Sequence, residues 1–182
     1  MSAELHFDLT LYPEPILRKQ ADLVTAFDAA LKATVAAMFE RMVESKGVGL
    51  AAPQVGLKLR ILVLNPTGEK ADDLVLVNPS ITARSGPDTT FDEGCLSFPG
   101  IYAEIRRPDR CTVTAWDTDG NKIEREFDGF VSRIIQHEYD HLEGVLLVDR
   151  MSPADKLKNR TALDELVGDY LKKQKKQAAA QR

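Results

Sequence analysis

Histidine and cysteine are scarce in this chain of 182 residues, which contains three histidines and two cysteines. Two cysteines, Cys95 and Cys111, cannot build the disulfide framework of a small secreted domain, so we expect a reducing, cytoplasmic location. No apolar run approaches the roughly 20 residues of a membrane-spanning helix. The first residues, MSAELHFDL, lack the basic stretch of a signal or transit peptide.

An excess of positive charge is also absent. The formal net charge is -4, which gives no electrostatic reason to expect specific DNA binding, and we expect no membrane partner. The content of 43% hydrophobic and 29% charged residues is ordinary for a globular protein, and the length suits one domain with a real core. We predict one catalytic domain over residues 1–170 and a basic, frayed C-terminal tail over residues 171–182.

Two of the three histidines lie together in the stretch QHEYDHL, residues 136–142. In a helix, His137 and His141 share one face because they are four residues apart. Two imidazoles on one face can bind one divalent metal ion, and the adjacent Glu138 can reach a water on that ion. Apolar residues at helical spacing and Gly144 at the expected C-terminal cap favour the helix.

A third metal ligand is needed, because catalytic sites usually combine three protein ligands with a water. The candidates are Cys95, Cys111, His6 and a carboxylate downstream of the helix. Cys111 begins a predicted strand, where a buried apolar thiol is the commoner outcome. Cys95 lies in residues 93–100, which glycine and proline predict to be a loop. The spacing favours Cys95 over a carboxylate by a small margin.

The rest of the chain reads as a mixture of helices and short strands. A long helix is predicted over residues 25–45, with Thr25 as N-cap and an end before Gly47. Another helix begins at Ser152. The stretch Arg106 to Pro108 is predicted to be a solvated edge. Apolar runs closed by turn residues predict strands at residues 60–64, 74–77, 112–116, 122–127 and 145–148.

The segment GVGLAAPQ, residues 47–54, is unusually small and uncharged for a surface loop. Small residues let a backbone pass close to another backbone or to a ligand, although a buried turn would have the same composition. Gln54 is its only polar side chain. An amide at this position could donate hydrogen bonds to a developing oxyanion.

Three segments together carry a family resemblance: GVGLAAPQ, EGCLS at residues 93–97, and QHEYDHL. They resemble the three signature motifs of peptide deformylase, in order and at similar spacing. The flanks PILR, residues 15–18, and GVLLVDR, residues 144–150, extend the resemblance to about Met151. Departures such as Ser132, Arg133 and Phe98 affect no candidate ligand.

The resemblance implies a small α+β fold, with antiparallel strands packed around a central metal-binding helix and with an N-terminal and a C-terminal helix. It implies that Cys95, His137 and His141 bind one divalent metal ion. Ferrous iron is the implied ion in cells, and zinc, nickel or cobalt can substitute. The implied reaction is removal of the N-formyl group from the initiator methionine of newly made polypeptides.

The chemistry of a formyl amide suggests roles for several residues. Glu138 would take a proton from the attacking water and pass it to the leaving amine. The Gln54 amide and the Leu96 backbone N–H would stabilise the oxyanion.

Other residues are expected to position the substrate. Gly49 would let the substrate backbone pair alongside like an added strand. Val48 and Ile134 would line an apolar slot for the methionine side chain. Glu93 would contact the substrate side of the site and brace the cysteine loop against Arg107.

Two other functions remain open at this stage. The first is a zinc endopeptidase with the H-E-x-x-H motif, in which Asp164 or Glu165 would supply the third ligand. The second is a structural metal site in a ribosome-associated binding module, although a closed site has no use for an unliganded Glu138.

The C-terminal helix has a possible partner of its own. In similar deformylases it can dock on the ribosome, and phosphate contacts from the tail would be sensitive to salt. The residues that would make them are Lys172, Lys173, Lys175 and Lys176.

Overall fold

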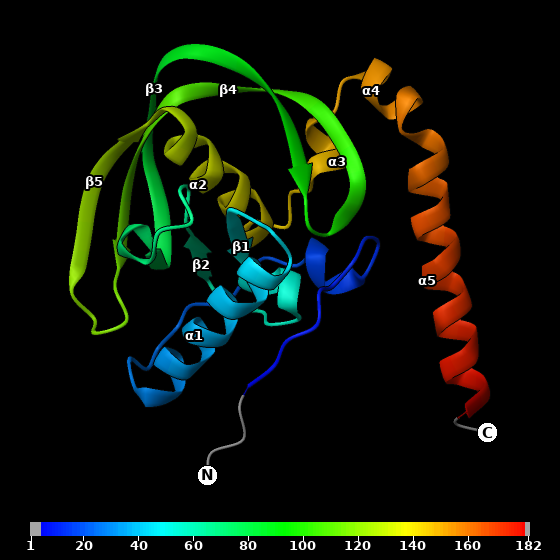
Figure 1. The fold of residues 1–182 in the computed structure, drawn as a ribbon, viewed down its shortest axis with the longest axis horizontal. Helices are drawn as coiled ribbons and strands as arrows, with labels where there is room; N and C mark the ends of the chain where they lie inside the picture. The colour runs from blue at the N-terminus through cyan, green and yellow to red at the C-terminus, as the bar shows by residue number, and fades with distance from the viewer. Residues whose placement is uncertain (1–4, 181–182) are drawn as a thin grey trace.

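Five strands form one antiparallel sheet in this computed structural model, which describes residues 5–180; the predictions made for residues 1–4 and 181–182 lie outside that range. The strands lie side by side in sequence order (Figure 1). The sheet and the helices around it confirm the predicted α+β class. The strands are β1 (Gly49–Ala51), β2 (Ile61–Leu64), β3 (Leu74–Cys95), β4 (Phe98–Trp116) and β5 (Lys122–Asp128).

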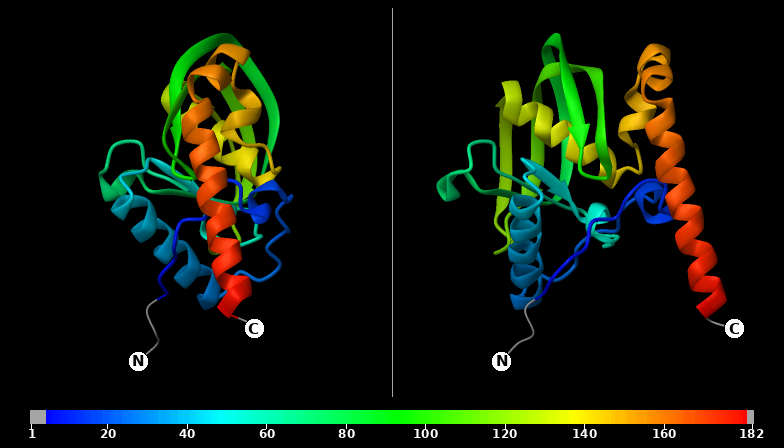
Figure 2. Two further views of the ribbon diagram at one scale, coloured as in Figure 1. Left: turned by 90° about the vertical axis from the view of Figure 1, so that its right-hand side faces the viewer. Right: turned by 45° about the vertical axis from the view of Figure 1, so that its right-hand side comes forward.

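In the described residues, five α-helices surround the sheet or extend from it. The curved strands β3 to β5 wrap around α2, and α5 stands at one side of the body (Figures 1 and 2). Short 3-10 helices cover residues 15–18, 52–55 and 70–72. The α-helices are α1 (Ala29–Glu44), α2 (Gly129–Leu142), α3 (Leu147–Arg150), α4 (Pro153–Lys158) and α5 (Arg160–Ala180).

The strand β2 separates two parts of the core because its side chains alternate between its faces. Leu62 and Leu64 pack with the residues of α2, including Ile135. Ile61 and Val63 belong to a second cluster that contains Val35, Met38 and Met42 of α1. All of these side chains are buried. The two helices are therefore held on opposite faces of the same strand.

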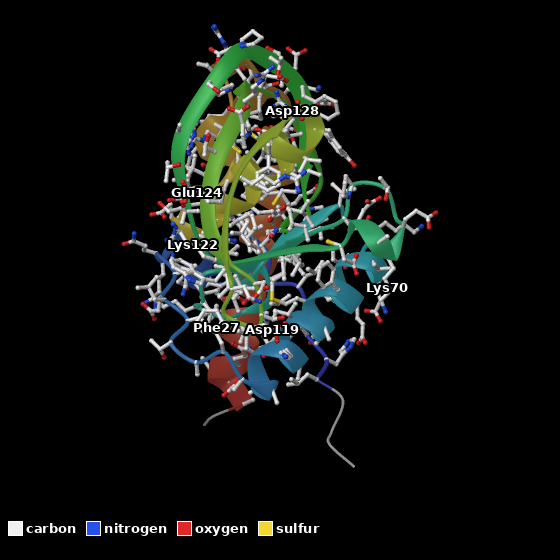
Figure 3. The ribbon with its side chains drawn as sticks, turned by 90° about the vertical axis from the view of Figure 1, so that its left-hand side faces the viewer. Phe27, Lys70, Asp119, Lys122, Glu124 and Asp128 are labelled. Atoms are coloured by element: carbon white, nitrogen blue, oxygen red, sulfur yellow. The ribbon has the colours of Figure 1, made fainter. Side chains whose placement is uncertain are left out.

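Helix α1 is shorter than its prediction. It begins at Ala29 because the Asp28 carboxylate accepts a hydrogen bond from the Leu31 backbone N–H at 3.0 Å, so Asp28 rather than Thr25 is the N-cap. Its C-terminal turn places Lys46, not Gly47, in the left-handed region. At the other end, Figure 3 shows Phe27 beside Asp119, at the tip of the β4–β5 hairpin.

The strands β3 and β4 are much longer than predicted. β3 continues past Asn78 and Pro79 to Cys95, and β4 starts at Phe98, so the segment predicted as a loop over residues 93–100 is the tight end of a hairpin. The pairing of β3 with β4 shifts register between Val77 and Ser80, so Asn78 and Pro79 form an irregularity within the strand and do not end it. The hairpin thereby brings Cys95 to one end of the sheet.

In the C-terminal part, one predicted strand is wrong and one predicted helix N-cap is confirmed. The predicted strand at residues 145–148 is instead a two-residue connection, residues 145–146, followed by the first two residues of α3. The Ser152 hydroxyl accepts a hydrogen bond from the Asp155 backbone N–H at 3.0 Å, as expected of an N-cap. Helix α5 then runs through the predicted tail as far as Ala180 and has no fully buried residue. The division at residue 170 stays a prediction.

Candidate metal and catalytic site

Helix α2 presents His137 and His141 on one face, as their spacing predicts. Gly144 ends the helical segment with a φ of 72°, where its missing side chain also admits the Arg18 carbonyl. Cys95 approaches the two histidines from the β3–β4 turn. The ligand atoms of the three residues lie within 4.8 Å of one another, and Cys95 Sγ is 3.2 Å from His141 Nε2.

The other candidates for the third ligand lie elsewhere. The Cys111 sulfur is buried and faces the Ser132 carbonyl at 3.9 Å. His6 is exposed, and Asp164 and Glu165 are exposed on α5. Within the described part of the chain, Cys95 is therefore the residue that joins the histidine pair.

A buried ionic network surrounds His137. Glu93 Oε2 lies 3.0 Å from His137 Nδ1, which leaves the Nε2 atom of that ring free for a metal. Arg107 donates from Nε and Nη2 to the two Glu93 oxygens at 2.7 and 2.9 Å. Arg133 adds a bond of 2.7 Å to the same carboxylate. The predicted contact between Glu93 and Arg107 is thus present. The Glu93 carboxylate braces His137 as well as the turn that carries Cys95.

Sequence reasoning missed most of this network. Arg107 was expected on a solvated edge, but it is 5% exposed and also donates to Asp140 at 2.8 Å. Arg133 was treated as a variable position, but it is buried against Glu93 and Thr89. The network holds four buried charges, which are stable only because each carboxylate meets a guanidinium. Of the residues that sequence reasoning missed, Asp140 had a local signal, because it lies inside the histidine motif.

The buried groups around the histidines have strongly altered proton affinities. Burial disfavours charge on His137, but hydrogen bonds to Cys95 and Glu93 raise its pKa well above the usual value. Burial and the charge of His137 lower the pKa of His141 well below it. Burial raises the pKa of Glu93, yet bonds from His137 and Arg107 bring it down to about 2. The carboxylate beside His137 is therefore ionised.

Glu138 is positioned beside these ligands without joining them. Burial raises its pKa to about 7, with a further contribution from the charge of Glu93. Its Oε2 atom is buried and has no hydrogen-bond partner in the described structure. A carboxyl group with a near-neutral pKa and an unused oxygen suits a general base.

Gln54 points its amide nitrogen toward the same place. Its oxygen accepts a hydrogen bond from the Ala51 backbone N–H at 2.8 Å, which fixes the orientation of the amide. Its Nε2 atom then lies 3.5 Å from Cys95 Sγ and 3.4 Å from the Ser97 hydroxyl. The segment 47–54 is therefore not a loop but β1 followed by a 3-10 helix that fixes a donor at the site.

A cleft of about 660 Å³ opens onto His137, Glu138 and Cys95. It is large enough for several residues of an extended peptide. Gly49 and Gln54 line it, and so does Glu93. The apolar part of its lining includes Val48, Leu96, Ile134, Phe91, Phe130 and Tyr102. Every site residue predicted from the sequence therefore lines the cleft except His141, which is buried.

The fold and sequence match one family over most of the chain. The family model of polypeptide deformylase matches residues 7–157. Over 143 residues the chain is 50% identical to the chloroplastic and mitochondrial peptide deformylase 1B of Arabidopsis thaliana. The matched region covers 78% of this chain and 52% of that relative. It is also 41% identical over 160 residues to the peptide deformylase of Thermotoga maritima, and this match covers 88% of this chain and 96% of that relative. The chain thus spans about half the length of the plant relatives.

Solved structures give the same result. A plant peptide deformylase 1B matches with a TM-score of 0.90 and 44% identity, covering 95% of each chain. The peptide deformylase of Plasmodium falciparum matches with a TM-score of 0.87 and 43% identity, covering 90% of this chain and 96% of that one.

Proposed function

The chain belongs to the polypeptide deformylase family, and on that premise we propose that it is a metal-dependent hydrolase that removes the N-formyl group from the initiator methionine of newly made polypeptides. One observation supports this more than any other. Three metal-ligating atoms lie within 4.8 Å of one another, beside a buried carboxyl oxygen that has no partner among the described residues.

The side chains fit a catalytic metal ion. One sulfur and two imidazole nitrogens make a three-ligand set, which leaves a position for water. When bound there, a divalent ion polarises a carbonyl and lowers the pKa of a water molecule. We propose ferrous iron as the ion in cells, because of the family resemblance, with zinc, nickel or cobalt as substitutes. Metal analysis of protein purified without oxygen tests this choice.

Glu138 is proposed to move the proton. It takes a proton from the attacking water and delivers it to the amine that leaves. Its buried Oε2 is the atom available for this task, because no protein group in the described structure occupies it. A pKa of about 7 allows Glu138 both to accept and to return the proton near neutral pH.

Two donors are proposed for the oxyanion. The Gln54 Nε2 atom is turned toward Cys95 by the bond that its oxygen makes to Ala51. The Leu96 backbone N–H is the second donor, and Leu96 lies in the turn that also lines the cleft. A preorganised donor of this kind typically contributes about 2.7–4 kcal/mol to transition-state stabilisation.

The substrate is proposed to bind as an extended strand along Gly49. Val48 and Ile134 border the slot for the methionine side chain, and both line the cleft. Glu93 contributes indirectly, because its carboxylate is bonded to Arg107, Arg133 and His137.

A direct assay separates this function from peptide cleavage. Purified protein loaded with a divalent metal should release formate from a formyl-Met tripeptide and leave its internal peptide bonds intact. Cleavage of an internal bond without formate release would instead indicate an endopeptidase. The structure gives that alternative no ligand set, because Asp164 and Glu165 are exposed on α5.

The C-terminal helix is proposed to bind the ribosome through its lysines. α5 extends from the body and is exposed along most of its length. Lys172 pairs with Asp169 and Lys173 with Glu14. Within residues 5–180, Lys175 and Lys176 form no ion pair, so they remain available to phosphates.

A truncation after Val167 tests the ribosome proposal. Deformylation of a free peptide should be nearly unchanged, whereas co-sedimentation with ribosomes at low salt should weaken. Equal co-sedimentation of both proteins would refute it. No helix in the described part of the chain could cross a membrane. A cytoplasmic location remains a proposal.

A further inference from the structure

Arg150, the last residue of α3, reaches the network around the histidines from outside. Its Nε and Nη2 atoms donate to the two Asp140 oxygens at 3.1 and 2.5 Å. Asp140 lies between the histidines in the sequence of α2 and also accepts from Arg107 at 2.8 Å. Arg107 in turn binds Glu93, which also accepts from Arg133 and lies 3.0 Å from His137 Nδ1. A continuous charged path joins α3 to one candidate metal ligand.

Arg107 is shared between two carboxylates, one of which also binds Arg150. Glu93 and Asp140 are both buried, with side-chain exposures of 5% and 9%. Arg107 donates two bonds to Glu93 and one to Asp140. Arg150 also donates to Asp140, and among residues 5–180 no other hydrogen bond reaches the Asp140 Oδ1 atom. Without Arg150, Asp140 would compete with Glu93 for Arg107.

The position of α3 does not depend on this ion pair. Leu146, Leu147 and Met151 around α3 are buried in a cluster with Leu17 and Phe98. Burial of large apolar side chains stabilises a segment more than a half-exposed ion pair does. The bidentate contact to Asp140 therefore has an effect other than holding α3 in place.

We propose that Arg150 is a positioning residue for His137, which acts through Asp140, Arg107 and Glu93 and couples the start of the C-terminal helices to the metal site. The proposal rests on the metal site of the proposed function. Metal binding by the unchanged protein tests that site first, so the two proposals can fail separately.

The chain offers a matched control on the same short helix. Arg18 binds Asp149, the neighbour of Arg150, and its side chain is 43% exposed against 45% for Arg150. Asp149 in turn accepts the Leu146 backbone N–H at 2.8 Å, so this pair anchors α3 without touching Asp140. The variants to compare are Arg150→Gln, Arg150→Lys and Arg18→Gln.

The measurement is the rate at which each cobalt-loaded protein loses its metal to an excess of chelator, followed by the thiolate–cobalt absorbance. We expect Arg150→Gln to release cobalt several-fold faster than wild type, less than the about 10–100-fold that loss of a direct partner of a metal ligand costs in affinity, because three residues separate Arg150 from His137. Arg150→Lys should be intermediate, because it keeps the charge but not the bidentate geometry. Arg18→Gln should remain within about twofold of wild type.

Thermal unfolding of the metal-free variants separates positioning from folding. Both substitutions remove an arginine that is nearly half exposed, but Asp140 is 9% exposed and Asp149 is 39% exposed, so Arg150→Gln should lose more stability than Arg18→Gln while both variants remain folded. Equal cobalt release rates for these two variants would overturn the proposal. If Arg150→Gln does not fold, Arg150→Lys decides: a release rate equal to wild type would also overturn it.

Discussion

Gly49 offers a sharp test of the site because the proposed base packs directly against it. A Cβ atom added at Gly49 would lie 2.5 Å from Glu138 Oε1 and 2.6 Å from Ile134 Cγ2. Real Cβ contacts essentially never fall below 3.0 Å, so in Gly49→Ala the carboxylate must retreat by about half an ångström. We expect overpacking to cost about 1–3 kcal/mol of stability.

The larger effect should be on turnover. Misplacing a catalytic group by about 1 Å can cost about 10²-fold, so a shift of half that size should lower kcat by roughly 10-fold or more. The ligand atoms of Cys95, His137 and His141 are not those that the new Cβ would meet, so metal content should be unchanged. The assay is formate release at saturating peptide, with metal content measured on the same sample.

A second glycine provides the control. Gly168 lies within α5, and a Cβ there would meet nothing within 4 Å. Gly168→Ala should leave kcat unchanged and stabilise the helix by up to about 1 kcal/mol. Wild-type kcat in metal-loaded Gly49→Ala would refute the claim that Gly49 sets the position of Glu138.

Four further outcomes follow from the same geometry. Cys95→Ala should lose metal and activity together, and full metal occupancy by elemental analysis would contradict the ligand set. Glu138→Gln should keep its metal but slow deformylation by roughly 10²–10⁴-fold; near-normal turnover would exclude Glu138 as the base. Arg107→Met should lower the free energy of unfolding by roughly 3 kcal/mol in urea titrations, because it removes one of the two guanidinium partners of each buried carboxylate, Glu93 and Asp140; a loss below about 1 kcal/mol would argue that the remaining partners, Arg133 and Arg150, compensate both. Since burial raises the pKa of the Cys111 thiol, iodoacetamide should label Cys95 in metal-stripped protein and spare Cys111 until unfolding, as peptide mass spectrometry would show; equal labelling would contradict this.

Local spacing predicted the helix that carries the histidines, because four-residue spacing places both rings on one face wherever α2 lies. It also predicted the caps at Ser152 and Gly144, which depend on a few neighbouring residues. The strand ends were harder. Asn78 and Pro79 are turn formers, yet Asn78 adopts a φ of 51° within β3 and bonds the Val24 backbone through its side chain. A tertiary contact here overrides a local signal.

The third metal ligand, Cys95, could not be assigned from local sequence patterns alone. Spacing alone favours Cys95 over a carboxylate only by a small margin, because its distance from the histidines depends on the register of two long strands. That register brings the turn after β3 to α2, and the bonds from Arg107 to Glu93 and Asp140 tie the turn to the helix. From the sequence alone, a charged residue such as Arg107 is predicted to lie on the surface, because isolated charges are costly to bury. Its partners, 14 residues before it and 33 residues after it, become neighbours only in the folded chain. The residue types of the metal site are thus visible in the sequence, whereas the buried network that fixes the distances between them depends on the tertiary structure.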